Sequence, residues 1–211
     1  MNSPAPLYGL VLTGGRSRRF GRDKAAFEIA GETLLQRTVE LLAPLVAELR
    51  VSVRPDQVSE SHRAAYPLLV DQLADGPGAG LLAAHAHAPA AAWLVLACDL
   101  PLINPAILVQ LSKLTQESDP DTDTRWDAIV PIVDDIPQPL HAIYHRRCLP
   151  AIRKRLAAGQ RRVICFFDDV RVRFVDEEEI RPYDSNLHSF LNVNTPQDWT
   201  CALSLLSAGL R

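Results

Sequence analysis

Cysteines are few and scattered in this chain, which argues against two kinds of cross-linked protein. Cys98, Cys148, Cys165 and Cys201 are widely spaced and form no CxxC pair, and no secretory apolar segment stands at the start. Neither a disulfide framework nor a four-thiolate zinc site is indicated. This cysteine usage suits a reducing compartment, and we expect a cytoplasmic protein.

Long hydrophobic runs are also missing. The most apolar stretch, residues 81–97, is interrupted by His85, His87 and Pro89. A helix that crosses a bilayer needs roughly 20 predominantly apolar residues. We therefore expect no association with a membrane.

The chain lacks both an excess of positive charge and a cluster of aromatic residues. It carries 22 Lys and Arg against 25 Asp and Glu, a formal net charge of −3, and Trp93, Trp126 and Trp199 are dispersed. Nucleic-acid binding by a basic stripe with interleaved aromatic residues is not indicated, so we expect no nucleic-acid partner. A local basic phosphate site remains compatible with this charge.

Motifs for zinc and for covalent catalysis are absent as well. The histidines at positions 85, 87, 141, 145 and 188 lack a zinc-binding spacing, and we expect surface groups or hydrogen-bonded core groups. No GxSxG elbow or other nucleophile motif occurs. This pattern favours direct displacement over a covalent enzyme intermediate.

Short apolar segments alternate with helical ones. Strands are expected at residues 8–12, 49–53, 66–70, 93–98, 128–133, 140–144 and 170–175. Helices are expected at residues 33–49, 80–87, 105–114, 148–158 and 196–206. Pro44 indicates a kink or break in the first helix, and the polar residues 117–127 are typical of a loop insertion.

This alternation predicts an α/β protein with a mostly parallel sheet, whose ligands lie beyond the carboxyl ends of the strands. The length of 211 residues suits one domain spanning residues 1–211.

A glycine-rich, basic loop follows the first expected strand. Residues 12–24 contain Gly14 and Gly15 and five basic residues, among them Arg18 and Lys24. Glycines let backbone amides approach a phosphate, and the two cations could neutralise a triphosphate. The loop matches neither a Walker A motif nor GxGxxG. The structural alternative is a glycine turn followed by a solvated basic face.

Two further strands are each followed by an aspartate. Asp99 follows the apolar residues 93–98, where a hard oxygen donor could hold magnesium against a phosphate. Asp71 follows a shorter strand and could accept hydrogen bonds from a base or ribose. The alternative for Asp99 is a turn or cap before Pro101, and Asp75 could equally be an ordinary loop acid.

A dinucleotide-binding fold is the main rival. Residues 78–83 read GxGxxA, and Asp99 follows about 20 residues later. However, residues 71–77 separate the first glycine from the strand, and this reading leaves the loop 14–24 without a role.

Two asparagines precede the last expected helix. Side-chain amides at Asn192 and Asn194 could ligate a metal or orient an acceptor phosphate. The alternative is ordinary capping by Asn194 or Thr195, with Pro196 at the first helical position.

These segments resemble the motifs of the molybdenum cofactor guanylyltransferases, which are nucleotidyltransferases with a Rossmann-like sheet. Residues 12–24 are similar to LAGGxxxRMGxDK, residues 71–80 to DxxxxxGPLAG, residues 93–101 to PCDxP and residues 190–196 to FxNVNTP. Thr13, Phe20 and Ala97 replace the usual alanine, methionine and proline. The four motifs occur in the same order and span most of the chain.

The resemblance implies a three-layer αβα sandwich of the nucleotide-diphospho-sugar transferase type. It implies Mg²⁺-dependent transfer of GMP from GTP to molybdenum-bound molybdopterin, with release of pyrophosphate. Arg18, Lys24 and Asp99 would be catalytic, and Asp99 and Asn194 would bind the metal. The implied binding residues are Leu12, Thr13, Gly14, Gly15, Arg18, Lys24, Asp71, Gly78, Asp99, Asn192 and Asn194.

The resemblance also concerns the acceptor and the partners. Residues 139–144 are similar to a family segment on the acceptor side, and the basic residues 160–163 are similar to one that meets the pterin phosphate. We expect a monomer with transient contacts to the proteins that donate and receive the cofactor.

Three alternative functions stay open. A cytidylyltransferase for the same cofactor and a sugar-1-phosphate nucleotidyltransferase share the fold, although the Gly14-Gly15 pair resembles the guanylyl branch. A nucleotide or pterin carrier without catalysis would result if Thr13 or Ala97 distorted the site.

Overall fold

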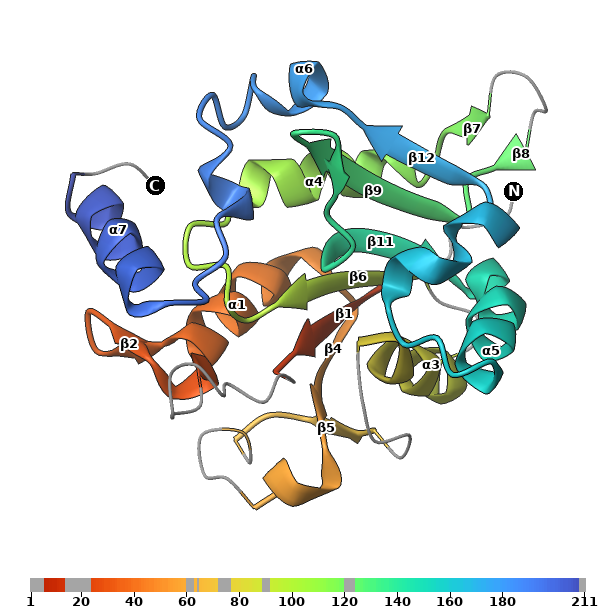
Figure 1. Ribbon diagram of the computed structural model, residues 1–211, viewed down its shortest axis with the longest axis horizontal. Coiled ribbons are helices and arrows are strands. Elements are labelled where there is room, and N and C mark those ends of the chain that lie inside the picture. The colour runs from red at the N-terminus through yellow and green to blue at the C-terminus, as the bar shows by residue number, and fades with distance from the viewer. Residues whose placement is uncertain are drawn as a thin grey trace.

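The molecule is built around one mixed sheet. The structure is a computed structural model, and it describes residues 6–13, 24–59, 63, 65–71, 77–88, 92–119 and 124–208. The sheet order is β10-β9-β11-β6-β1-β4-β5, with β12 also paired to β9. Figure 1 shows β12 and β11 on opposite sides of β9. The strands are β1 (Leu7–Leu12), β4 (Glu48–Val53), β5 (Leu68–Val70), β6 (Ala92–Ala97), β9 (Ala128–Val133), β10 (Ile136–Pro137), β11 (His141–His145) and β12 (Val172–Val175).

The strands that matter for the site run parallel and end together. β1 pairs in parallel with both β4 and β6, and β4 pairs in parallel with β5. Leu12 at the end of β1 is in register with Ala97 in β6 and with Ser52 in β4. The side chains that follow these strands therefore gather at one edge of the sheet.

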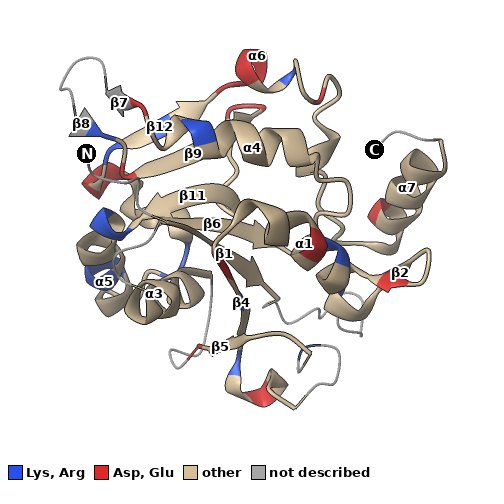
Figure 2. Ribbon diagram, turned by 180° about the vertical axis from the view of Figure 1, so that it is seen from behind, with Lys and Arg blue, Asp and Glu red and all other residues tan. Residues whose placement is uncertain are grey.

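Helices cover both faces of the sheet. On one face α1 (Leu34–Leu42) and α4 (Pro105–Leu114) pack, and Figure 2 shows them in front of the strands. On the other face lie α3 (Pro77–His87) and α5 (Leu149–Ala157), visible together in Figure 1. The short helix α6 (Glu177–Ile180) and the longer α7 (Pro196–Ser207) lie further along the chain. The predicted three-layer α/β architecture is confirmed.

Alternation along the strands explains the two cores. Leu10 packs with residues of α3 and α5, whereas its neighbour Val11 packs with residues of α1 and α4. Successive side chains of a strand point to opposite faces, so a strand buried on both faces must be apolar throughout. All six residues of β6 are buried, as this arrangement requires.

The first predicted helix is too long. α1 ends at Leu42, the 3₁₀ helix η2 (Ala43–Leu45) follows, and β4 already begins at Glu48. Pro44 explains the break, because proline lacks the amide that an α-helix interior needs. Thr33, predicted to start the helix, is its N-cap and accepts a hydrogen bond from the Gln36 amide at 3.1 Å.

Several short elements were not predicted. The segment expected as a loop insertion contains a hairpin of two-residue strands, β7 (Ser118–Asp119) and β8 (Thr124–Arg125). A second hairpin joins β2 (Glu28–Ile29) and β3 (Glu32–Thr33). The remaining 3₁₀ helices are η1 (Lys24–Ala26), η3 (Pro55–Gln57), η4 (Arg146–Cys148), η5 (Val163–Asp169) and η6 (His188–Phe190). Elements this short carry too few residues to show a periodic pattern.

The four cysteines are all free thiols, and Cys98 and Cys148 are buried. Within the described segments, the helices are too short or too polar to span a bilayer.

Two histidines lie in the core. His85 in α3 and His141 in β11 are 0% and 1% exposed. The His85 ring has no hydrogen-bond partner among the described residues, so it differs from the hydrogen-bonded core group that we expected. The His141 ring lies against the backbone of Ser189, whose hydrogen bond partly opposes the effect of burial on its pKa. Burial lowers the pKa of each ring to about 4, because the charged form would lose its hydration.

The buried rings predict a loss of stability in mild acid. His141 stays neutral in the folded protein down to about pH 4, whereas the unfolded chain binds its proton below about pH 6.5. This difference favours unfolding as the pH falls from about 6.5 to about 4, by about 2 kcal/mol at pH 5. We expect His141→Leu to show a smaller loss of unfolding free energy between pH 7 and pH 5 than the wild type in urea titrations. An unchanged difference would contradict this assignment.

Candidate nucleotide and metal site

Three polar side chains from distant parts of the chain meet beyond the end of β6. The ammonium nitrogen Nζ of Lys24 donates to Oδ1 of Asn194 at 2.7 Å and lies 3.4 Å from Oδ2 of Asp99. The side chains of Lys24 and Asp99 are 15% and 24% exposed, so both are shielded but reachable from solvent. We call these three residues the Lys24 cluster.

Backbone hydrogen bonds hold Asp99 and the residue before it in place. The amide of Cys98 donates to the carbonyl of Leu12 at 3.2 Å, which carries the pairing of β6 with β1 past the end of the strand. The amide of Val193 donates to the carbonyl of Asp99 itself at 2.9 Å. Asp99 is thus attached both to the sheet and to the segment that contains Asn194.

Asn194 directs its side chain at Lys24 and leaves helix capping to its neighbour. Thr195 is the N-cap of α7, and its hydroxyl accepts from the Asp198 amide at 3.2 Å. The Asp198 carboxylate accepts from the amides of both Asn194 and Thr195, each at 2.8 Å. Of the two capping alternatives, the structure selects Thr195.

Asn192 does not join the cluster in this structure. Its side chain is exposed, and no hydrogen bond connects it to Lys24 or to Asp99 among the described contacts. The amide of Val193, one residue further on, makes the connection to Asp99 instead.

Thr13, the last described residue before the glycine-rich segment 14–23, takes part in a buried bridge. The hydroxyl of Thr13 donates to the carbonyl of Ser52 at 2.8 Å and accepts from Nε of Arg63 at 3.0 Å. Leu12, Thr13 and Arg63 are buried, Arg63 completely. The hydroxyl that distinguishes Thr13 from the alanine usual in the resembled motif therefore fills a structural role.

Sequence reasoning missed both partners of Thr13. Ser52 lies inside β4, and Arg63 stands apart from every motif. Arginine is rarely buried, and the sequence alone does not indicate which acceptor would pair with it inside the fold.

Three predicted site residues, Gly14, Gly15 and Arg18, lie outside the described residues.

Asp71 and the glycines of α3 border the same edge of the sheet. Asp71 is buried, and its amide donates to the carbonyl of Val53 at 2.8 Å, extending the pairing of β5 with β4. A methyl group on Gly80 would lie 2.7 Å from Oγ of Ser52 and 2.9 Å from Cδ2 of Leu12. This helix can approach β1 and β4 so closely only because Gly80 has no side chain.

Gly78 packs against the segment after α5. A methyl group there would lie 3.4 Å from the carbonyl oxygen of Arg161 and 3.5 Å from Cδ2 of Leu156. Gly78 and Gly80 both lie within α3 rather than in a turn directly after a strand. Their position disfavours the dinucleotide reading, whose first glycine belongs to such a turn.

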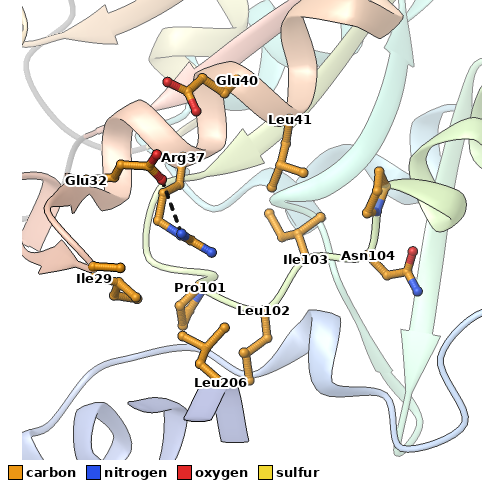
Figure 3. A pocket seen from close by; sticks show the side chains of 12 residues that line it. Ile29, Glu32, Arg37, Glu40, Leu41, Pro101, Leu102, Ile103, Asn104 and Leu206 are labelled. Carbon is orange, nitrogen blue, oxygen red and sulfur yellow. Dashed lines mark hydrogen bonds and ion pairs between the residues drawn. The ribbon is translucent and has the colours of Figure 1, made fainter. Parts of the chain in front are cut away.

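A cavity of about 730 Å³ is lined by none of the residues of the Lys24 cluster. Figure 3 shows it between α1, the β2–β3 hairpin and the segment after Asp99, with the Arg37–Glu32 ion pair on its wall. None of the described residues predicted for the site lines it.

Comparison with solved structures defines the class of protein. The molybdopterin-guanine dinucleotide biosynthesis protein A of Archaeoglobus fulgidus superposes with a TM-score of 0.80 at 26% identity, over 95% of this chain and 99% of that one. The 4-diphosphocytidyl-2C-methyl-D-erythritol synthase of Anaerococcus prevotii shares the fold, with a TM-score of 0.68 at 12% identity over 97% of both chains. The protein is a nucleotidyltransferase with the nucleotide-diphospho-sugar transferase fold.

Sequence comparison defines the family. Residues 9–171 match the model of the MobA-like NTP transferase domain, and the chain belongs to this family. A probable molybdenum cofactor guanylyltransferase of Pelotomaculum thermopropionicum is 36% identical over 191 residues, covering 90% of this chain and 88% of that protein. A protein of the same name from Methanosarcina mazei is 33% identical over 203 residues, covering 90% and 86%.

The Thr13 bridge predicts a stability effect. Thr13→Ala leaves the buried Nε of Arg63 and the carbonyl of Ser52 without this hydroxyl, which should lower the free energy of unfolding by about 1–3 kcal/mol. Thr13→Ser keeps the hydroxyl and is the matched control, with a smaller loss expected. Urea denaturation of both variants measures the effect, and equal stability of Thr13→Ala and wild type would show that the bridge contributes nothing.

Proposed function

We propose that this protein transfers GMP from GTP to molybdenum-bound molybdopterin, forming molybdopterin guanine dinucleotide and pyrophosphate. The family and the names of its relatives support this reaction. The observation that carries the proposal is the Lys24 cluster, in which one cation, one carboxylate and one amide oxygen meet at the carboxyl edge of the parallel strands. Ligands of open α/β sheets bind at this edge.

The chemistry of the cluster fits a magnesium ion. Asp99 and Asn194 both turn an oxygen atom toward a single cationic nitrogen, so the site already holds positive charge between hard oxygen donors. Magnesium is usually bound by one or two carboxylates together with substrate phosphates, rather than by a cage of protein ligands. Asp99 and Asn194 would hold the ion, which would act as a Lewis acid on the α-phosphate.

Lys24 would neutralise the charge on the phosphate that is transferred. A terminal phosphate oxygen of the acceptor attacks the α-phosphorus of GTP, and the bond to the pyrophosphate breaks on the opposite side. Negative charge builds up on the oxygens around phosphorus and on the leaving group. Among the described residues, the Lys24 ammonium contacts Asp99 and Asn194, and it can turn from them to these oxygens. Arg18 is proposed as a second cation. The attacking phosphate oxygen is already ionised, so the reaction needs no strong base.

The remaining site residues are proposed for nucleotide binding. Leu12, Thr13 and the Gly14-Gly15 pair would contact the base and ribose, together with Asp71 and Gly78. Asn192 would contribute on the acceptor side. A single domain, a monomeric state and a cytoplasmic location also stay proposals, as do contacts with the proteins that supply and receive the cofactor.

Two substitutions test the catalytic assignments. Loss of one electrostatic contact to a transition state typically lowers turnover by about a hundredfold or more, so Lys24→Ala and Asp99→Ala should each do so. Both side chains are partly exposed, and the variants should therefore keep the wild-type melting temperature to within a few degrees. The measurement is pyrophosphate release with GTP, magnesium and molybdopterin acceptor.

Matched controls and other nucleotides sharpen this test. Lys113→Ala and Asp168→Ala remove one exposed charge of each sign away from the cluster and should leave turnover unchanged. Replacing GTP by CTP or ATP should lower pyrophosphate release. Preference for CTP would show a cytidylyltransferase, and nucleotide binding without pyrophosphate release would show a carrier. Near wild-type turnover of Lys24→Ala or Asp99→Ala would refute the assigned roles.

A further inference from the structure

Asp198 is bound to the backbone next to the Lys24 cluster more extensively than helix capping requires. It lies in the first turn of α7, where its Oδ2 accepts hydrogen bonds from the amides of Asn194 and Thr195, both at 2.8 Å. In a capping box, the side chain at this position bonds only to the amide of the N-cap, here Thr195. The bond to Asn194 is additional and fixes the residue whose side chain contacts Lys24.

Asn194 is thereby held from both sides. Before it, the amide of Val193 is bonded to the carbonyl of Asp99, and its own amide is bonded to Asp198. Its side chain is exposed and would otherwise be free to rotate, but it receives the Lys24 ammonium at 2.7 Å. A side chain that must present one oxygen atom to a cation benefits from such a fixed backbone.

We propose that Asp198 is a positioning residue, which holds Asn194 and Lys24 in the arrangement that binds the metal–nucleotide complex. It acts through the hydrogen bonds that it accepts from the backbone amides of Asn194 and Thr195, without touching the reacting atoms. This inference rests on the proposed function, because it assigns the cluster to a divalent metal and a nucleoside triphosphate. It adds a residue that the motif comparison leaves as an ordinary part of a helix start.

The test measures metal binding independently of turnover. Mn²⁺ replaces Mg²⁺ as the probe, and the free Mn²⁺ signal in electron paramagnetic resonance gives its affinity in the presence of GTP. Loss of a residue that supports a metal ligand typically lowers metal affinity by about 10–100-fold, so Asp198→Ala should bind Mn²⁺ about tenfold or more weakly. The magnesium concentration for half-maximal pyrophosphate release should rise in parallel. Asp198→Asn keeps the shape and one acceptor oxygen but loses the charge, and it should fall between Asp198→Ala and wild type.

Two controls separate positioning from helix capping. Thr195→Ala removes the hydroxyl that caps α7 but leaves the Asp198 carboxylate and its bond to the Asn194 amide. Asp176→Ala removes the cap of α6, where the carboxylate accepts from the Glu179 amide at 3.0 Å. Both should lower the melting temperature and leave Mn²⁺ affinity within twofold of wild type.

The outcomes decide between the two roles. Wild-type Mn²⁺ affinity in Asp198→Ala, or in Asp198→Asn if the alanine variant does not fold, would show that Asp198 only caps the helix. An equal loss of affinity in Thr195→Ala would overturn the proposal in the same way. If the wild type binds Mn²⁺ with GTP but releases no pyrophosphate with acceptor, the proposed reaction is wrong, and the Mn²⁺ titration still judges Asp198. A wild type that binds no Mn²⁺ with GTP, CTP or ATP overturns both.

Discussion

The contact of one ammonium group with Asp99 and Asn194 joins three distant parts of this protein. Lys24 follows the glycine-rich segment 14–23, Asp99 follows the buried strand β6, and Asn194 precedes the last described helix. The cation balances the charge of Asp99 and gives the Asn194 amide oxygen a donor. Because the contact is solvent-accessible, its direct contribution to stability is small, and its value lies in assembling the site.

The rest of the fold makes this assembly possible. Parallel pairing of β1 with β4 and β6 aligns their carboxyl ends, so residues far apart in the chain emerge side by side. The buried bridge with Ser52 and Arg63 anchors Thr13, directly after β1, to this edge. Gly80 lets α3 approach the same strands from one face. The strands and a close-packed helix thus support a site whose side chains come from the segments between regular elements.

Two features show how a relative's motif can change without loss of local order. Thr13 replaces a smaller residue, and its hydroxyl finds an acceptor and a donor inside the protein. Ala97 is the buried last residue of β6 and is in register with Leu12, so the strand continues to its end where the resembled motif has proline. Both substitutions are accommodated by ordinary hydrogen bonding and strand pairing.

The sequence by itself determined the alternation of strands and helices, the boundaries of α4 and β9, and the identity of Lys24, Asp99 and Asn194 as a chemically related set. Apolar periodicity and the ends of buried strands are local signals, and a single chain carries them. Only the tertiary structure decided that Thr195 caps α7, that Arg63 is buried against Thr13, and that Asp198 binds the amide of Asn194. It also decided that His85 and His141 lie buried in the core. These features depend on which groups meet across the fold, and spacing along the chain does not encode such meetings.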